Sequence, residues 1–135
     1  TACGLAHGAT APVTLLTGDL AFLHDSNGLL LRQKLRGSLT VVLVNNRGGG
    51  IFGHLPVAAF EPPFEEFFAT PQDVDFSPLC AAHGVSHTLV RDWAQFSALI
   101  TAPAANGIRV LELRTDRKLD AARRKQWFAE IAAGL

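Results

Sequence analysis

The segments GDL at positions 18–20 and NNRGGGIF at positions 45–52 decide the fold of this 135-residue chain. Each follows a short apolar run, residues 13–17 before the first and residues 39–44 before the second. Such runs predict strands that are buried on both faces of a parallel sheet. Asp19 and Asn46 lie 27 positions apart, which leaves room for a helix between the two strands. We therefore expect both residues at the carboxyl ends of strands, where open α/β folds bind ligands.

Strand-like and helix-like patterns alternate along the rest of the chain. This alternation predicts an α/β fold, a three-layer α/β/α arrangement around a mostly parallel sheet. The second predicted helix has polar residues at 25–28, where it could stop and restart, and Pro103 is expected to end the fourth. Further strands are predicted at residues 86–90 and 108–113, and helices at residues 1–9, 20–35, 77–83, 93–102 and 116–133.

A long segment, residues 45–63, is predicted to be irregular because it is rich in glycine and proline. Loops of this length in compact domains are usually functional or disordered. A short helical turn is expected just after it, at residues 65–70. The region is too apolar for a solvated linker, so we expect an interface or a lid that is exposed without its partner. Its aromatic residues are Phe52, Phe60, Phe64, Phe67 and Phe68.

Length and composition predict a single domain, residues 1–135, with a substantial core. Twelve basic residues balance twelve acidic ones, which argues against a nucleic-acid partner. No apolar run approaches the ~20 residues of a membrane span, and no signal peptide is visible. Cys3 and Cys80 predict buried free thiols and a reducing, cytoplasmic location. The chain begins with Thr1 inside a predicted helix, which indicates a fragment of something longer.

The predicted strand ends carry oxygen ligands of the kind that Mg²⁺ prefers. Asp19 offers a carboxylate, Asn46 a side-chain carbonyl and Gly48 a backbone carbonyl, and two diphosphate oxygens would join them. Backbone N–H groups at residues 18–20 and 49–50 are expected to face that diphosphate. In the alternative interpretation Asp19 caps a helix and the two asparagines form a turn.

The same residues resemble the thiamine-diphosphate motif, usually written GDG…NN, with Leu20 in place of the third residue. Together with Leu55-Pro56 and the segment RTDR at 114–117, they resemble the 2-succinyl-5-enolpyruvyl-6-hydroxy-3-cyclohexene-1-carboxylate synthase (MenD) family. The resemblance covers nearly the whole chain. It implies a thiamine-diphosphate-binding fold in which Asp19, Asn46 and Gly48 bind the metal, Mg²⁺ or Mn²⁺.

The resemblance also implies roles for the loop that follows the metal ligands. Ile51 matches the bulky residue that holds the cofactor in its bent conformation, and Phe52 and Leu55 match apolar residues that line the site. The residues expected to bind the cofactor are Gly18, Asp19, Leu20, Asn46, Gly48, Gly49, Gly50, Ile51, Phe52 and Leu55.

Enzymes of this family are transferases of menaquinone and phylloquinone biosynthesis, which decarboxylate 2-oxoglutarate and add the succinyl unit to isochorismate. Their activating glutamate belongs to a pyrimidine-binding domain of the same or a neighbouring chain, which implies a homo-oligomer at full length. The resemblance therefore implies that this chain is a C-terminal diphosphate-binding domain. It would contain no catalytic residue of its own and would be inactive alone.

The residues alone leave two other functions open. The chain could belong to another thiamine-diphosphate enzyme, such as a 2-oxo-acid decarboxylase or an acetolactate-synthase-like protein, or it could be a non-catalytic nucleotide-binding module. Arg47 and His54 each allow two interpretations, contact with an anionic substrate or a plain surface position.

Overall fold

The computed structural model describes residues 1–102 and 105–134, and these fall into two compact units. The first, which we call the sheet unit, comprises Thr1–Asn45 and Val74–Arg114. The second, which we call the loop–helix unit, comprises Asn46–Asp73 and Thr115–Leu135. Each is described in turn.

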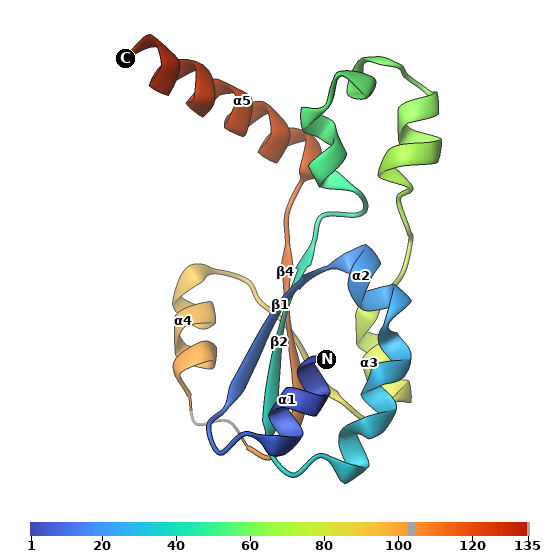
Figure 1. Ribbon diagram of the computed structural model, residues 1–135, viewed down its shortest axis with the longest axis vertical. Helices are drawn as coiled ribbons and strands as arrows, with labels where there is room; N and C mark the ends of the chain where they lie inside the picture. Colours follow the sequence, from blue (N-terminus) through green and yellow to red (C-terminus); the bar gives the residue numbers. More distant parts are fainter. Residues whose placement is uncertain (103–104, 135) are drawn as a thin grey trace. The chain divides into compact units, whose positions relative to one another are not determined.

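A four-stranded sheet forms the centre of the sheet unit (Figure 1). Its strands lie in the order β1-β2-β4-β3, and every pairing is parallel. Val-rich β2 is central, and seven of its eight residues are buried, as expected for a strand covered on both faces. The strands are β1 (Val13–Gly18), β2 (Ser38–Asn45), β3 (Ser86–Leu89) and β4 (Gly107–Arg114).

Helices cover both faces of this sheet. Figure 1 shows α4 on one side, and α2 and α3 on the other. The main core lies on the second side, where Phe22 and Phe76 meet edge to face above Leu43 and Val110. The α/β fold and its layering, predicted from the alternating pattern, are confirmed. The helices are α1 (Ala2–Gly8), α2 (Asp19–His24), η1 (Ser26–Lys34), α3 (Phe76–Ala82) and α4 (Trp93–Thr101).

Two expectations for the sheet unit were wrong in detail. We expected β1 to be buried on both faces, but it is an edge strand with alternate residues exposed, and Leu16 is 71% exposed. The helix predicted at 20–35 is interrupted at its polar residues 25–28, as we expected, but it restarts as the 3₁₀ helix η1 and not as an α-helix. The expected stop at Pro103 lies outside the described residues.

The loop–helix unit consists of short turns and one long helix. The segment expected to be irregular contains two 3₁₀ turns, η2 (Gly50–His54) and η3 (Pro56–Ala59), and its first residue, Asn45, belongs to β2. A π-helical turn, η4 (Glu65–Ala69), follows at the predicted place. The long helix α5 (Arg117–Ala133) agrees with the prediction and is capped by Asp116. No helix among the described residues is both long and apolar enough to cross a membrane.

Candidate functional site

In the sheet unit, the predicted strand ends of β1 and β2 lie side by side. Gly18 pairs with Val44 in the register, so Asp19 and Asn45 are the next residues at the same edge of the sheet. Asp19 is buried and opens α2, and its Oδ1 accepts a hydrogen bond from the backbone N–H of Leu20 at 3.0 Å. The prediction that the two apolar runs form parallel strands is therefore confirmed for β1 and β2.

Asn46 is the first residue of the loop–helix unit, and its side chain has an unsatisfied acceptor. Its Oδ1 is buried and has no hydrogen-bond partner among the described residues. Buried side-chain oxygens almost always have a partner, so an orphaned one requires an explanation. The residue also lines a hollow of about 190 Å³ together with Ile51, His54 and Arg117. A cation bound to the oxygen would satisfy it.

The glycines after Asn46 allow a very close approach of backbone segments. Gly48 has φ +129°, and a Cβ there would lie 2.4 Å from the carbonyl oxygen of Ala69. A Cβ on Gly49 would lie 2.7 Å from the carbonyl oxygen of Phe68. No other residue type fits these two positions without movement of the backbone.

The amides of these glycines, which we expected to face a diphosphate, have hydrogen-bond partners within the chain. The N–H of Gly49 donates to the carbonyl of Ala69 at 2.7 Å, and the N–H of Gly50 donates to the carbonyl of Gly48 at 2.9 Å. The amide of Leu20, also expected to face the ligand, is bonded to Asp19.

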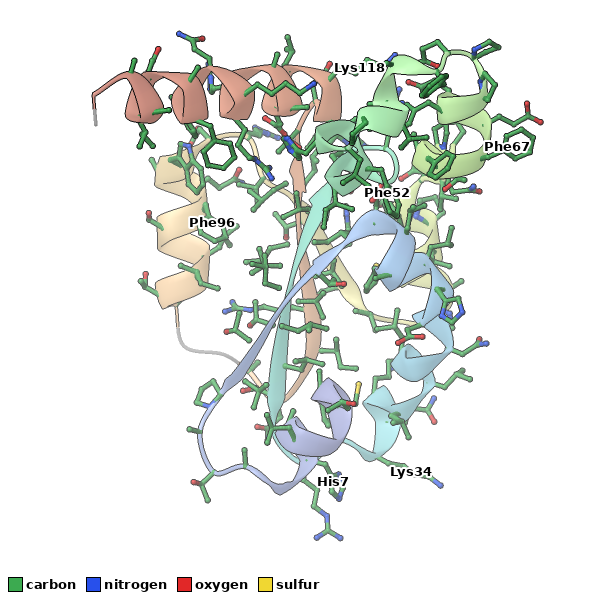
Figure 2. The ribbon with its side chains drawn as sticks, turned by 45° about the horizontal axis from the view of Figure 1, so that its top comes forward. His7, Lys34, Phe52, Phe67, Phe96 and Lys118 are labelled. Carbon is green, nitrogen blue, oxygen red and sulfur yellow. The ribbon has the colours of Figure 1, made fainter. Side chains whose placement is uncertain are left out.

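Three apolar residues predicted for the site project from or follow η2. Ile51 is 73% exposed, while Phe52 and Leu55 are 37% and 49% exposed. Phe52 packs edge to face on Phe68, with ring centroids 6.2 Å apart. Of the five predicted lid phenylalanines only Phe64 is buried, and Figure 2 shows Phe67 pointing outward from η4. The expected exposure of this aromatic cluster is thus confirmed for four of its members.

An ion-pair cluster joins η4 to the start of α5. Arg117 donates to both carboxylate oxygens of Glu65, and its Nη1 lies 3.1 Å from Oε1. Lys118 Nζ lies 2.7 Å from the same Oε1. Hydrogen bonds from Arg117 and Lys118 lower the pKa of Glu65 from 4.5 to about 2. Arg117 also donates to the carbonyl of Arg47 at 3.2 Å, so the cluster holds the loop at the site.

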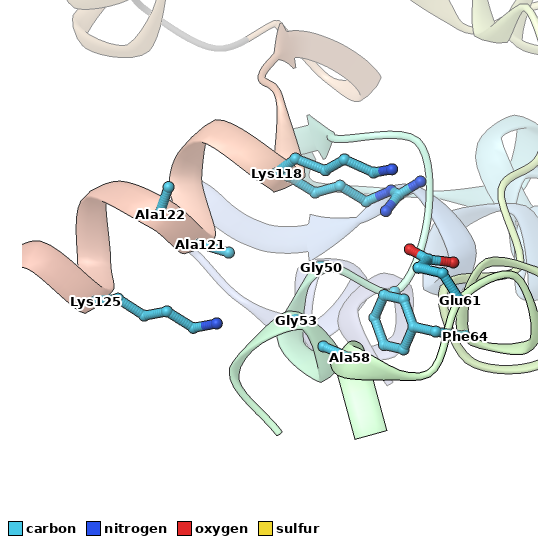
Figure 3. Close-up of a pocket in the computed structure, with 11 residues that line it drawn as sticks. Gly50, Gly53, Ala58, Glu61, Phe64, Lys118, Ala121, Ala122 and Lys125 are labelled. Atoms are coloured by element: carbon cyan, nitrogen blue, oxygen red, sulfur yellow. The ribbon is translucent and has the colours of Figure 1, made fainter. Parts of the chain in front are cut away.

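Beside this cluster lies a pocket of about 270 Å³ that is built from η2, η3, the segment between η3 and η4, and α5 (Figure 3). Lys118, Ala121 and Lys125 line it from α5, and Phe64 and Glu61 line it from the opposite segments. Its floor includes Gly50 and Gly53. The pocket is therefore apolar in its base, with charges of both signs at its border.

Sequence reasoning missed two residues that organise the region. Arg117 was quoted in the motif without a role, although it holds both Glu65 and the loop carbonyl. Glu112 was not noticed at all, although it is fully buried on β4. A signal was present, because a charged residue two positions after Val110 falls on the core face of a strand.

Comparison with known proteins identifies the class of protein to which this chain belongs. The sequence profile of the family described as "Thiamine pyrophosphate enzyme, C-terminal TPP binding domain" matches residues 1–118. The chain belongs to this family, whose cofactor is thiamine diphosphate under its other name.

Curated relatives carry a more specific name, 2-succinyl-5-enolpyruvyl-6-hydroxy-3-cyclohexene-1-carboxylate synthase. The chain is 53% identical over 133 residues to the protein of Trichormus variabilis, and this covers 98% of the chain and 23% of the relative. It is 58% identical over 121 residues to the protein of Gloeothece citriformis, covering 90% of the chain and 21% of the relative. The resemblance inferred from the motif is confirmed. The chain spans less than a quarter of the length of these relatives.

Solved structures agree on the fold. The thiamine diphosphate-dependent 4-hydroxybenzoylformate decarboxylase of Rhodococcus jostii RHA1 matches with a TM-score of 0.68 at 23% identity, over 85% of this chain and 22% of that one. Benzoylformate decarboxylase from Polynucleobacter necessarius matches with a TM-score of 0.65 at 21% identity, over 86% of this chain and 23% of that one. At these identities the likeness concerns the fold alone.

Proposed function

We propose that this chain is the metal- and diphosphate-binding part of a thiamine-diphosphate-dependent enzyme that makes 2-succinyl-5-enolpyruvyl-6-hydroxy-3-cyclohexene-1-carboxylate. The observation that carries the proposal is the buried, unpartnered Oδ1 of Asn46 at the motif position expected for a metal ligand. Family membership and the high identity to the named synthases support it.

The residues present fit a Mg²⁺ or Mn²⁺ ion bound to a diphosphate. Asp19, Asn46 and Gly48 offer a carboxylate, an amide oxygen and a backbone carbonyl, which are the hard ligands such ions require. The orphaned oxygen of Asn46 is a ready acceptor for the ion. Gly18 and Leu20 flank the carboxylate, and Gly49 and Gly50 shape the loop behind the amide.

The exposed apolar residues of η2 are assigned to the organic part of the cofactor. Ile51, Phe52 and Leu55 present apolar surface next to the metal ligands along the chain. We assign to Ile51 the support of the bent cofactor, and to Phe52 and Leu55 the lining of the site. When bound, thiamine diphosphate supplies the electron sink for decarboxylation and carbon–carbon bond formation.

The substrates proposed for the whole enzyme are 2-oxoglutarate and isochorismate. A pyrimidine-binding domain of the same or a neighbouring chain would bring the activating glutamate, and the complete enzyme would be a homo-oligomer. We further propose that residues 1–135 act as one C-terminal domain and that the enzyme is cytoplasmic. The free thiols of buried Cys80 and half-buried Cys3 are consistent with a reducing compartment.

The test uses a hybrid enzyme in which this chain replaces the matching region of the Trichormus variabilis synthase. We expect the hybrid to form product from 2-oxoglutarate and isochorismate, and the 135-residue chain alone to form none. A hybrid that turns over pyruvate or benzoylformate instead would favour another enzyme of the same cofactor class. Turnover by the isolated chain would show that the activating group lies within it.

Metal binding is tested separately by calorimetric titration of Mg²⁺ with thiamine diphosphate present. We expect Asp19→Asn and Asn46→Ala each to weaken Mg²⁺ binding to the hybrid by at least about tenfold, because the first removes the negative charge of a ligand and the second removes a ligand oxygen. The matched controls are Asp25→Asn and Asn27→Ala, which change exposed residues of the same types. Unchanged affinity in both ligand variants would contradict the proposed metal site.

A further inference from the structure

A buried carboxylate that the proposed function does not use lies at the carboxyl end of the sheet. Glu112 on β4 is 0% exposed and shares the core face with Val110. Removing an ionised carboxylate from water costs several kcal/mol unless charged and hydrogen-bonding groups compensate. Burial of this carboxylate therefore has a cost in desolvation free energy. The side chains that hydrogen-bond to it indicate its structural role.

Three side chains from three neighbouring strands converge on Glu112. The side-chain amide of Asn45 on β2 donates to Oε1 at 2.8 Å, and Arg114 Nε donates to the same oxygen at 2.9 Å. The ring Nε2 of His87 on β3 lies 2.7 Å from Oε2. Burial raises the pKa of Glu112, but hydrogen bonds from Arg114, Asn45 and His87 outweigh it and leave the pKa below 4.5. The group is thus a fully engaged carboxylate.

Asn45 connects this network to the proposed site. It is the last residue of β2 and the first asparagine of the motif, and it follows Val44, whose partner on β1 is Gly18. Asp19 therefore comes next on β1 as Asn45 comes next on β2. Asn46, whose Oδ1 has no hydrogen-bond partner, follows Asn45 directly in the chain. The next two residues, Arg47 and Gly48, have positive φ. Asn45 is therefore the residue of the sheet unit that immediately precedes Asn46.

We propose that Glu112 is a positioning residue for the metal and diphosphate site, because its buried carboxylate holds Asn45 and thereby fixes the strand end from which Asn46 departs. The motif then contains two asparagines for two different reasons. The first is anchored inside the sheet by Glu112, and the second offers its oxygen to the metal. This inference rests on the proposed function, since it assigns Glu112 a role toward that same site.

The main test measures Mg²⁺ affinity of the hybrid enzyme in the presence of thiamine diphosphate. We expect Asn45→Ala and Glu112→Ala each to weaken Mg²⁺ binding by about 10- to 100-fold, the usual effect of removing a group that orients a ligand. Glu112→Gln should recover part of the affinity, because its Oε1 can still accept from Asn45. The double variant Asn45→Ala/Glu112→Ala should bind no more weakly than Glu112→Ala, because both changes break the same contact.

Val110→Ala is the matched control, because Val110 is equally buried on the same face of β4 but lies outside the network. It should destabilise the chain and leave Mg²⁺ affinity within about twofold, since it disturbs no group that orients Asn45. Where Glu112→Ala does not fold, Asn45→Ala carries the test, since it leaves Arg114 and His87 on the carboxylate. A second readout without cofactor is the ¹H–¹⁵N spectrum of the 135-residue chain, in which Glu112→Gln should move the side-chain signals of Asn46 and Val110→Ala should not.

The possible failures are distinguishable. An unaltered hybrid that does not bind Mg²⁺ with thiamine diphosphate overturns the proposed function and this inference together. Weakened binding in Asn46→Ala with unchanged binding in Asn45→Ala overturns only the role of Glu112. Equal weakening by Val110→Ala and Glu112→Ala also overturns it, because the effect would then be general destabilisation.

Discussion

The two units of this chain use their apolar residues in opposite ways. In the sheet unit, leucines and valines from the central strands are completely buried, and Leu43 is 0% exposed. In the loop–helix unit, α5 exposes Leu119, Phe128 and Ile131, each by more than 60%. The local geometry of that unit depends instead on glycines that allow close approach of the backbone and on the ion pairs of Glu65.

The difference indicates which unit buries its apolar surface through contacts of its own. Burial of apolar surface is the dominant stabilising force in folding, and the sheet unit obtains it internally. Contiguous exposed apolar surface instead marks an interaction site. The loop–helix unit carries both the aromatic cluster and the apolar residues of α5, which agrees with the proposal that further domains complete the site. The predictions below test this contrast.

The largest effect is expected from a matched pair of leucines. Leu43→Ala should lower the free energy of unfolding by about 3 kcal/mol, because it leaves a cavity between packed side chains. Leu119→Ala, at a residue that is 69% exposed, should change it by less than about 0.5 kcal/mol. Urea unfolding followed by circular dichroism measures both. Equal losses in the two variants would show that the contrast between the units is false.

A smaller effect is expected from the glycine loop. Gly48→Ala should destabilise the loop–helix unit by about 2 kcal/mol, because φ is +129° and the new Cβ would meet the Ala69 carbonyl. Gly53→Ala is the control, because its Cβ would make an ordinary 3.4 Å contact with Ala121. Amide hydrogen exchange, which resolves the units, should show faster exchange in η4 only for Gly48→Ala. The same exchange in both variants would mean that the close approach contributes nothing.

Removal of the Glu65 carboxylate should have an effect of about 1 kcal/mol at neutral pH, because the group is partly exposed and solvent screens the pairs. The pKa of Glu65 is lowered to about 2, so its stabilisation is complete above pH 4.5 and disappears as the pH falls toward 2. Glu65→Gln should thus differ from the parent at pH 6 and match it near pH 2. Glu66→Gln, at an exposed neighbour, is the control. Thermal melts over this pH range measure the difference, and a constant offset between parent and variant would be the contrary result.

The smallest effect concerns the cap of α5. The Asp116 carboxylate accepts from the amides of Lys118 and Leu119 at 2.9 and 3.0 Å, and these bonds lower its pKa. Asp116→Ala should reduce helix stability slightly, because the two amides lose their acceptor. Asp92→Ala, which removes the corresponding cap of α4, should cost about the same in the sheet unit. Hydrogen exchange at the first turn of each helix measures both effects. A loss of protection in only one of the two helices would contradict the prediction, because both helices have the same kind of cap.

The sequence predicted the strands and most helices because their signals are local. Apolar runs, Gly84 and the cap at Asp116 depend on nearby residues only. The exposed face of β1 was not predictable, because Leu16 is at an edge only through the strand order, which pairs residues far apart. The hydrogen bond from the Gly49 amide was missed for the same reason, since its acceptor Ala69 lies twenty positions further on.

The candidate site was predictable as a set of residue types, because Asp19 and Asn46 follow apolar runs at a characteristic spacing. The distant side chains that hold the site residues and the loop in place were not predictable. Glu112 meets Asn45 across 67 positions, and Arg117 meets Glu65 across 52. A single sequence carries no signal for which distant polar residues will pair, except that a charge on the core face of a strand must have a partner.

The strand order β1-β2-β4-β3 has a consequence for synthesis of the chain. Of the described strands, β4 is made last, yet it takes the place between β2 and β3. While the ribosome is still adding residues before 107, β3 has no described strand to pair with, and one edge of β2 is open. The network around Glu112 forms only after that insertion. Completion of the sheet must therefore wait until β4 has been translated, and chaperones have a period in which an apolar strand edge is accessible.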